Sequence, residues 1–251
     1  MTAPALAFRF RVVIFVLLYV LGFVPPWDFH SGSRTTLWLA ASTLLARSGW
    51  IGLASATLAV TLAALGCLLA GAGLRVWGTA YLGSSIMRDS ALHGEGLVAA
   101  GPYRYLRNPL YLGAWLLSLG ASILMPLEGA AFFLTAFSLF VVLLITTEER
   151  FLSAKMGSAY QQYCLAVPRL WPRITAGAAA SAARPHWLQA MLAEIYPITF
   201  TACFAALAWR YNARILIQCL LICYGASLVV RALTKSTPPA PEEIRDRRVS
   251  P

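Results

Sequence analysis

Six apolar stretches, separated by polar or glycine- and proline-rich segments, dominate the hydrophobic pattern of the chain. Each is long enough, or nearly so, to cross a hydrocarbon core of about 30 Å as an α-helix. They cover residues 10–27, 50–74, 111–125, 130–147, 192–209 and 215–233. Only a Pro-Leu-Glu-Gly turn at 126–129 separates the third from the fourth, which predicts a helical hairpin. We therefore predict an all-α, multi-pass transmembrane helical bundle of about six spans.

Small residues recur within two of these spans, and those on the second lie three or four positions apart. They are Ala63, Gly66, Ala70 and Gly73 on the second, and Gly113, Ser118 and Gly120 on the third. Small side chains let helix backbones approach closely in lipid, so we expect these faces to pack against neighbouring helices.

Composition supports a membrane protein. Of the 251 residues, 59% are apolar and 12% are charged, against roughly 25% charged in soluble domains, and the mean hydropathy is +0.68. These values exclude a water-soluble globule and a disordered chain. The five cysteines are scattered without a C-x-x-C pair, so neither a disulfide framework nor a metal site is predicted.

The net charge of +10 is explained by topology rather than by nucleic acid, because the basic residues form no stripe with interleaved aromatics. With six spans, sixteen of the twenty arginines and lysines fall on the side of the termini. The positive-inside rule then predicts that both termini are cytoplasmic. Arginine outnumbers lysine 18 to 2, which indicates a GC-rich bacterial genome and hence the bacterial inner membrane.

Two linkers divide the chain. An Ala/Gly/Ser-rich stretch at 175–186 separates a membrane core (1–174) from a C-terminal transmembrane helix pair (187–235). Residues 236–251 are polar and proline-rich, so we expect a disordered tail.

Candidate chemistry lies in the two longest polar segments, which both fall on the predicted cytoplasmic side. The first precedes the third span, and its glycines and prolines leave backbone groups free for a ligand. The second follows the fourth span and reads as a cytosolic amphipathic helix. It begins with Glu148 and Glu149, two carboxylates at the negative end of a membrane helix, which need a cationic partner: an arginine or a ligand ammonium.

Both segments carry a recognisable motif. The first reads GPYRYLRNPLYLG at 101–113, and the second reads EE-x2-L-x4-G-x2-Y-x2-Y-x3-VPR at 148–169. In this order, around a hairpin, the motifs resemble the isoprenylcysteine carboxyl methyltransferase and phospholipid methyltransferase family. The motif-bearing part covers 74–173.

The resemblance implies an integral-membrane methyltransferase that uses S-adenosylmethionine without a Rossmann domain. A carboxylate suits the methionine ammonium, and aromatic faces suit the sulfonium. The cofactor-binding residues carried over are Glu95, Gly96, Leu97, Val98, Gly101, Tyr103, Arg107, Asn108, Pro109, Leu110, Tyr111 and Glu148. Asn108 stands where the family often has histidine, which argues against a general base at this position.

The implied acceptor is a lipophilic molecule that enters from the bilayer: a prenylcysteine-like carboxylate, a lipid amine or a thiol. For an amine or thiol, Glu149 or a water held by Arg169 would accept the proton. Ala166 stands where prenylcysteine enzymes have an arginine, so the acceptor stays open.

Two other classes of function are compatible with parts of the sequence. A membrane reductase of the sterol type also carries an R-[HN]-P-x-Y-like segment and would bind NADPH. A non-enzymatic membrane scaffold would bind neither cofactor and would leave the glycine-rich loop unexplained. The block at 148–169 favours the methyltransferase.

Overall fold

The computed structural model describes residues 10–26, 35–82, 99–178 and 184–210, and the single positions 222, 225 and 229. The elements in these ranges are α2 (Arg11–Phe23), α3 (Leu37–Arg47), α4 (Leu53–Leu82), the 3₁₀ turn η1 (Gly101–Arg104), α6 (Pro109–Ser122), α7 (Leu127–Met156), α8 (Ser158–Ala166), α9 (Trp187–Ala193) and α10 (Ile195–Arg210). The predicted all-α class is confirmed for this part of the chain. The tail and the residues Glu95, Gly96, Leu97 and Val98 lie outside the described ranges, as does the predicted sixth span apart from the positions 222, 225 and 229.

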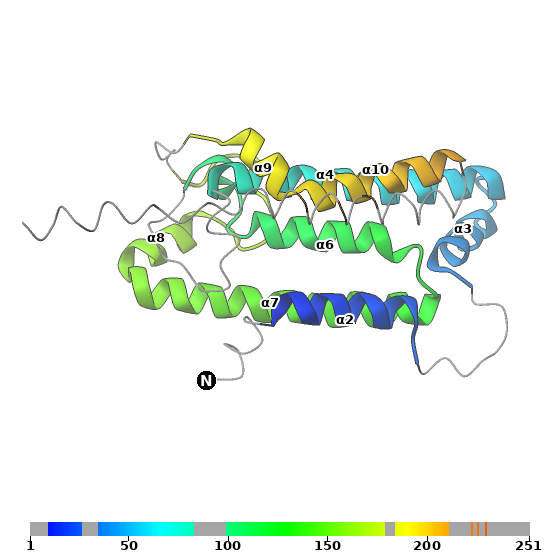
Figure 1. Ribbon diagram of the computed structural model, residues 1–251, viewed down its shortest axis with the longest axis horizontal. Coiled ribbons are helices and arrows are strands. Elements are labelled where there is room, and N and C mark those ends of the chain that lie inside the picture. Colours follow the sequence, from blue (N-terminus) through cyan, green and yellow to red (C-terminus); the bar gives the residue numbers. More distant parts are fainter. Residues whose placement is uncertain are drawn as a thin grey trace, which may run out of the picture.

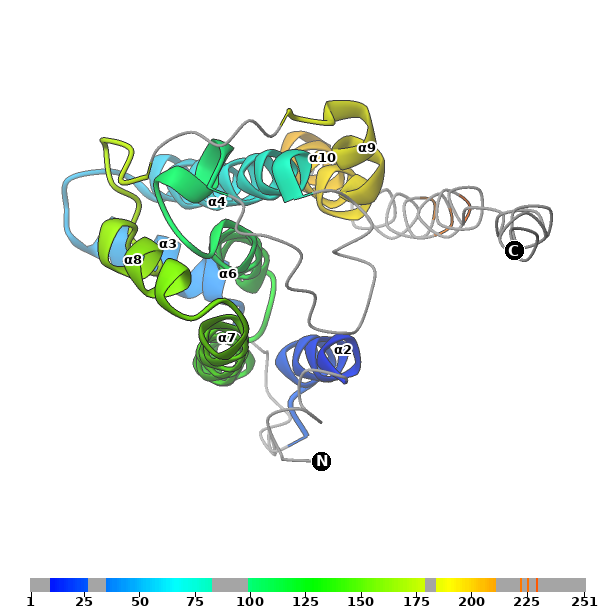
Figure 2. The same cartoon turned by 90° about the vertical axis from the view of Figure 1, so that its left-hand side faces the viewer.

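The long helices run side by side in a bundle (Figure 1). In both views, α6 lies between α4 on one side and α7 on the other (Figure 2). Helix α4 also packs against α3, α9 and α10, while α7 packs against α2, α6 and α8. The end of α7, the start of α6 and α8 meet at one end of the bundle, and α3 lies at the opposite end (Figure 1).

Two of the described helices, α4 and α7, are long and apolar enough to cross a membrane. The pair α9 and α10 qualifies as a third span if it is taken together, although it bends by 68° at its break. Helices α2 and α3 are apolar but shorter. The described residues therefore contain two or three candidate spans, and the prediction of six is not confirmed.

The polar helix predicted after the fourth span is divided in the structure. Helix α7 continues without a break past Glu149 to Met156, because no glycine or proline interrupts it. Gly157 then adopts a φ of +58°, which favours glycine, and α8 begins at the next residue. Residues 148–163 thus belong to two helices rather than to one amphipathic helix.

Helix α3 was not predicted from the sequence. Thr36 caps its start by accepting a hydrogen bond from the Leu39 amide at 3.3 Å. The indole of Trp38 donates to Thr61 on α4 at 2.9 Å, which attaches the helix to the bundle.

The close contact between α4 and α6 depends on glycines. A Cβ on Gly71 would lie 2.7 Å from the carbonyl oxygen of Gly113, and a Cβ on Gly120 would lie 2.8 Å from that of Ala64. The expectation for the third span is confirmed at Gly113 and Gly120. The stripe predicted on the second span is wrong: Ala63, Gly66, Ala70 and Gly73 are exposed. Spacing defines a helix face but does not say which face meets a neighbour.

Substitution of two nearby glycines on α4 tests this packing. Gly71→Ala is expected to destabilise the protein by about 1–3 kcal/mol, because the added methyl group meets backbone that must shift. Gly73→Ala is the matched control: its Cβ meets nothing within 4 Å, so the higher helix propensity of alanine should leave stability unchanged or raise it by up to about 1 kcal/mol. Thermal unfolding in detergent measures both, and equal melting temperatures would contradict the packing argument.

Candidate active site

The two sequence motifs lie against each other at one end of the bundle. Backbone hydrogen bonds tie the segment before α6 to the segment after α8. The Arg107 amide donates to the Pro168 carbonyl at 2.9 Å, and the Arg173 amide donates to the Tyr105 carbonyl at 3.1 Å. Residues about sixty positions apart therefore build one site, as the resemblance requires.

Glu149 is the polar centre of this region. Its carboxylate accepts two hydrogen bonds from Arg169, at 3.0 Å from Nε and 2.7 Å from Nη2. Asn108 donates to it through Nδ2 at 3.1 Å, and Nη1 of Arg107 lies 3.5 Å away. The cationic partner predicted for the acid pair is therefore present at Glu149. These contacts join the end of α7 to the start of α6 and to the segment after α8.

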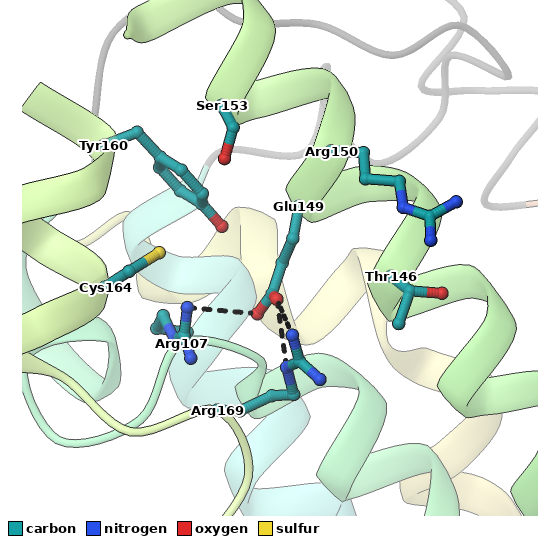
Figure 3. Close-up of a pocket in the computed structure, with 8 residues that line it drawn as sticks. All are labelled: Arg107, Thr146, Glu149, Arg150, Ser153, Tyr160, Cys164 and Arg169. Atoms are coloured by element: carbon teal, nitrogen blue, oxygen red, sulfur yellow. Dashed lines mark hydrogen bonds and ion pairs between the residues drawn. The ribbon is translucent and has the colours of Figure 1, made fainter. Parts of the chain in front are cut away.

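A pocket of about 450 Å³ opens beside this cluster. Figure 3 shows Arg107 and Arg169 pointing at Glu149, with Tyr160 and Cys164 of α8 facing the same space. The lining residues are Arg107, Thr146, Glu149, Arg150, Ser153, Tyr160, Cys164 and Arg169. Arg107, Glu149 and Arg169 were predicted site residues. The other five, at positions 146, 150, 153, 160 and 164, were not assigned to the site from the sequence. Tyr160 could have been found, because it belongs to the second motif.

Glu148 makes a different set of contacts from its neighbour. Its carboxylate accepts a hydrogen bond of 2.9 Å from the hydroxyl of Tyr111, which lies in the first turn of α6. Adjacent positions on a helix point about 100° apart, so the two carboxylates serve two sides of α7. The predicted cofactor residues Tyr111 and Glu148 are thereby brought together.

Tyr103 places a hydroxyl group in the interior near Glu148. Its backbone carbonyl accepts a hydrogen bond of 2.7 Å from the hydroxyl of Tyr163, which fixes η1 against α8. Burial raises the pKa of the Tyr103 side chain well above its ordinary value, and the nearby Glu148 carboxylate raises it further. The hydroxyl is therefore a neutral donor, and within the described ranges it has no hydrogen-bond partner.

The remaining predicted residues have structural positions near the site. Gly101 has a φ of +53° and lies against the ring of Tyr81, so a side chain there would be strained and would clash. Pro109 and Leu110 begin α6 and contact Gly78 of α4.

A second polar cluster was missed by the sequence reasoning. Arg75 of α4 forms an ion pair with Glu194, at the break between α9 and α10, with an N–O distance of 2.7 Å. Thr79 donates to the same carboxylate at 2.9 Å. Arg75 is the only charged residue in the sequence of α4, which is the signal that could have pointed to it.

Comparison of the sequence with known proteins indicates a related family. The family model described as phospholipid methyltransferase matches residues 58–159. The matched part is less than half of the chain, and it contains the first motif and the first half of the second. The resemblance drawn from the two motifs is confirmed. Together with its apolar helices, the family supports an integral membrane protein and a methyltransferase.

One curated relative extends the comparison. The cobalt-zinc-cadmium resistance protein CzcN of Cupriavidus metallidurans is 33% identical over 136 residues, which are 54% of this chain. The aligned region spans 59% of the length of that relative. No solved structure matches the chain.

Proposed function

We propose that the protein is an integral-membrane methyltransferase that moves a methyl group from S-adenosylmethionine to a lipophilic acceptor reached from the bilayer. The observation that carries the proposal is that the two neighbouring carboxylates, Glu148 and Glu149, have different partners. Glu149 is held by two arginines and an amide, whereas Glu148 has the Tyr111 hydroxyl as its hydrogen-bond partner among the described residues, and the charge of Arg11 on α2 also acts on it. Glu148 therefore keeps a carboxylate oxygen for a cation of the ligand.

The residues at this end of the bundle fit the cofactor. S-adenosylmethionine carries an ammonium, a carboxylate and a sulfonium. Glu148 suits the ammonium, and the aromatic rings of Tyr103 and Tyr111 suit the sulfonium. The buried Tyr103 hydroxyl and the Nε of Arg107, both without a hydrogen-bond partner in the described part of the chain, are donors for polar ligand atoms. Arg107 also lines the pocket of about 450 Å³ on the Glu149 side of α7, which has the size of a small-molecule site.

The chemistry of the reaction depends on alignment. The bound cofactor supplies an activated methyl group, and transfer to a nucleophile requires an in-line approach without water. On this proposal Glu148 binds the ligand ammonium, and Tyr111 orients Glu148. Arg107, Asn108 and Arg169 hold the surrounding segments together through Glu149.

The contacts of Glu149 favour a positioning role over the predicted role of proton acceptor. Both oxygens of its carboxylate already accept hydrogen bonds, Oε1 from Asn108 and Oε2 from Arg169, and these bonds join three chain segments. Arg169 is half-exposed, so it stays a candidate for holding a water molecule that takes the proton of an amine or thiol.

Ligand binding to the purified protein tests this function. Calorimetric titration in detergent is expected to show micromolar affinity for S-adenosylmethionine and S-adenosylhomocysteine and none for NADPH. Binding of NADPH alone would support the sterol-type reductase, and binding of none of the three would support a scaffold. A positive result justifies the next step, which is transfer of a radioactive methyl group to a membrane lipid extract.

A further inference from the structure

Arg75 lies where a charge is costly. It is the single charged residue of α4, a helix long and apolar enough to span a membrane. Its partner Glu194 is 1% exposed and lies at the 68° break between α9 and α10. An ion pair in such a place is a weak source of stability, because the cost of removing two charges from water can exceed their attraction. Attachment of α9 and α10 to α4 is therefore a poor explanation for the pair by itself.

The guanidinium of Arg75 has donors left over. Its Nε and Nη2 atoms contact the two oxygens of Glu194 at 2.7 and 3.0 Å, which occupies one edge of the group. Nη1 lies 3.4 Å from the carbonyl of Leu110, near the limit for a hydrogen bond. An arginine has five N–H groups, so the edge formed by Nη1 and Nη2 can still bind a planar anion. The side chain as a whole is 21% exposed, so Arg75 is not fully enclosed by packing.

The surroundings of Arg75 connect it with the proposed cofactor site. Leu110 lies in the first turn of α6, one residue before Tyr111. Tyr111 in turn donates to Glu148 of α7 at 2.9 Å. Arg75 of α4 and Glu148 of α7 therefore contact consecutive residues in the first turn of α6. The Tyr103 hydroxyl, which has no hydrogen-bond partner in the described residues, is a further donor at this end of the bundle.

We propose that Arg75 binds the carboxylate of the methionine portion of the cofactor, with its guanidinium fixed by Glu194 at the break between α9 and α10. The inference rests on the proposed function; Arg75 lies within the family match to residues 58–159, and its positioning partner Glu194 lies beyond it. The zwitterionic end of the ligand would then meet a complementary pair of charges, with Glu148 on α7 taking the ammonium and Arg75 on α4 taking the carboxylate. A Glu194 carboxylate without Arg75 would repel the ligand, so Arg75 is the binding residue and Glu194 is a positioning residue.

A comparison of two ligands on matched variants tests this assignment. The ligands are S-adenosylhomocysteine and S-adenosyl-3-thiopropylamine, which lacks the carboxylate and keeps the ammonium. The test protein is the double variant Arg75→Met/Glu194→Leu, which removes both charges together and avoids a buried unpaired charge. Arg107→Met is the comparison variant, because Arg107 is the other arginine near the acid pair, and Arg47→Met at the opposite end of the bundle is the control.

In wild type, loss of the ligand carboxylate should weaken binding by roughly 10- to 100-fold, the range for hydrogen bonds to a charged group. In Arg75→Met/Glu194→Leu, S-adenosylhomocysteine should bind as weakly as S-adenosyl-3-thiopropylamine does, while the affinity for the latter and the melting temperature stay near those of wild type. Arg47→Met should behave as wild type.

Other results would overturn the inference. If the double variant bound both ligands more weakly by the same factor, Arg75 and Glu194 would have a structural role only. If its affinity for both ligands were unchanged, Arg75 would not contact the ligand. Loss of the carboxylate effect in Arg107→Met alone would assign the carboxylate to Arg107. Failure of wild type to bind either ligand would instead reject the proposed function, which separates the two failures.

Discussion

Glu149→Ala is expected to be strongly destabilising, by about 3 kcal/mol. The substitution leaves the side chains of Arg107, Arg169 and Asn108 without their shared acceptor, and breaking a buried ion pair typically costs about 3–5 kcal/mol. The lower end of this range applies because Arg169 is 50% exposed and can regain water. The effect should appear as a lower melting temperature in detergent.

Glu128→Ala on the same helix is the matched control for this prediction. Glu128 is exposed in the first turn of α7, so its loss should change stability by at most about 0.5 kcal/mol. If Glu149→Ala had the same melting temperature as Glu128→Ala, Glu149 would have no part in joining α7 to the start of α6. The melting temperature of Glu149→Gln should lie between those of Glu149→Ala and Glu128→Ala, because the amide oxygen of glutamine can still accept one of the hydrogen bonds.

The contacts of the acid pair could be predicted from the sequence more closely than the number of spans and the packing of the helices. Two carboxylates at a helix end imply a cationic partner from elementary electrostatics, and Arg107 and Arg169 provide it at Glu149. Glu148 differs, since its hydrogen-bond partner in the described ranges is the Tyr111 hydroxyl, while the charge of Arg11 on α2 also acts on it. Local charge patterns thus indicated that a partner is needed but not which chain segment supplies it.

The missed features all depend on contacts distant in sequence. Arg75 and Glu194 are 119 positions apart, and neither lies in a motif. The stripe of small residues on α4 was assigned to packing, yet Gly71, two positions from the exposed Gly73, makes the contact with α6. Helix spacing fixes relative directions on one helix only, and the choice of buried face depends on all neighbouring helices together.

Glu148→Gln tests the proposed cofactor site directly. The substitution keeps the shape of the side chain and an acceptor for the Tyr111 hydroxyl but removes the charge that would bind the ligand ammonium. We expect S-adenosylhomocysteine to bind roughly 10- to 100-fold more weakly, as for other lost charge-assisted hydrogen bonds. Binding of 5′-methylthioadenosine, which lacks both the ammonium and the carboxylate, should be unchanged. Calorimetric titration of both ligands measures the difference.

Thr147→Val is the control that separates this effect from damage to α7. The Thr147 hydroxyl bonds to the Leu143 carbonyl of its own helix at 2.8 Å, so its loss removes a polar group beside Glu148 without touching another element. Thr147→Val should bind both ligands as wild type does. If Glu148→Gln weakened both ligands equally, Glu148 would shape the site without meeting the ammonium. If Glu148→Gln changed the affinity for neither ligand, the acid pair would have only a structural role, and the partner of the ligand ammonium would have to lie elsewhere in the chain.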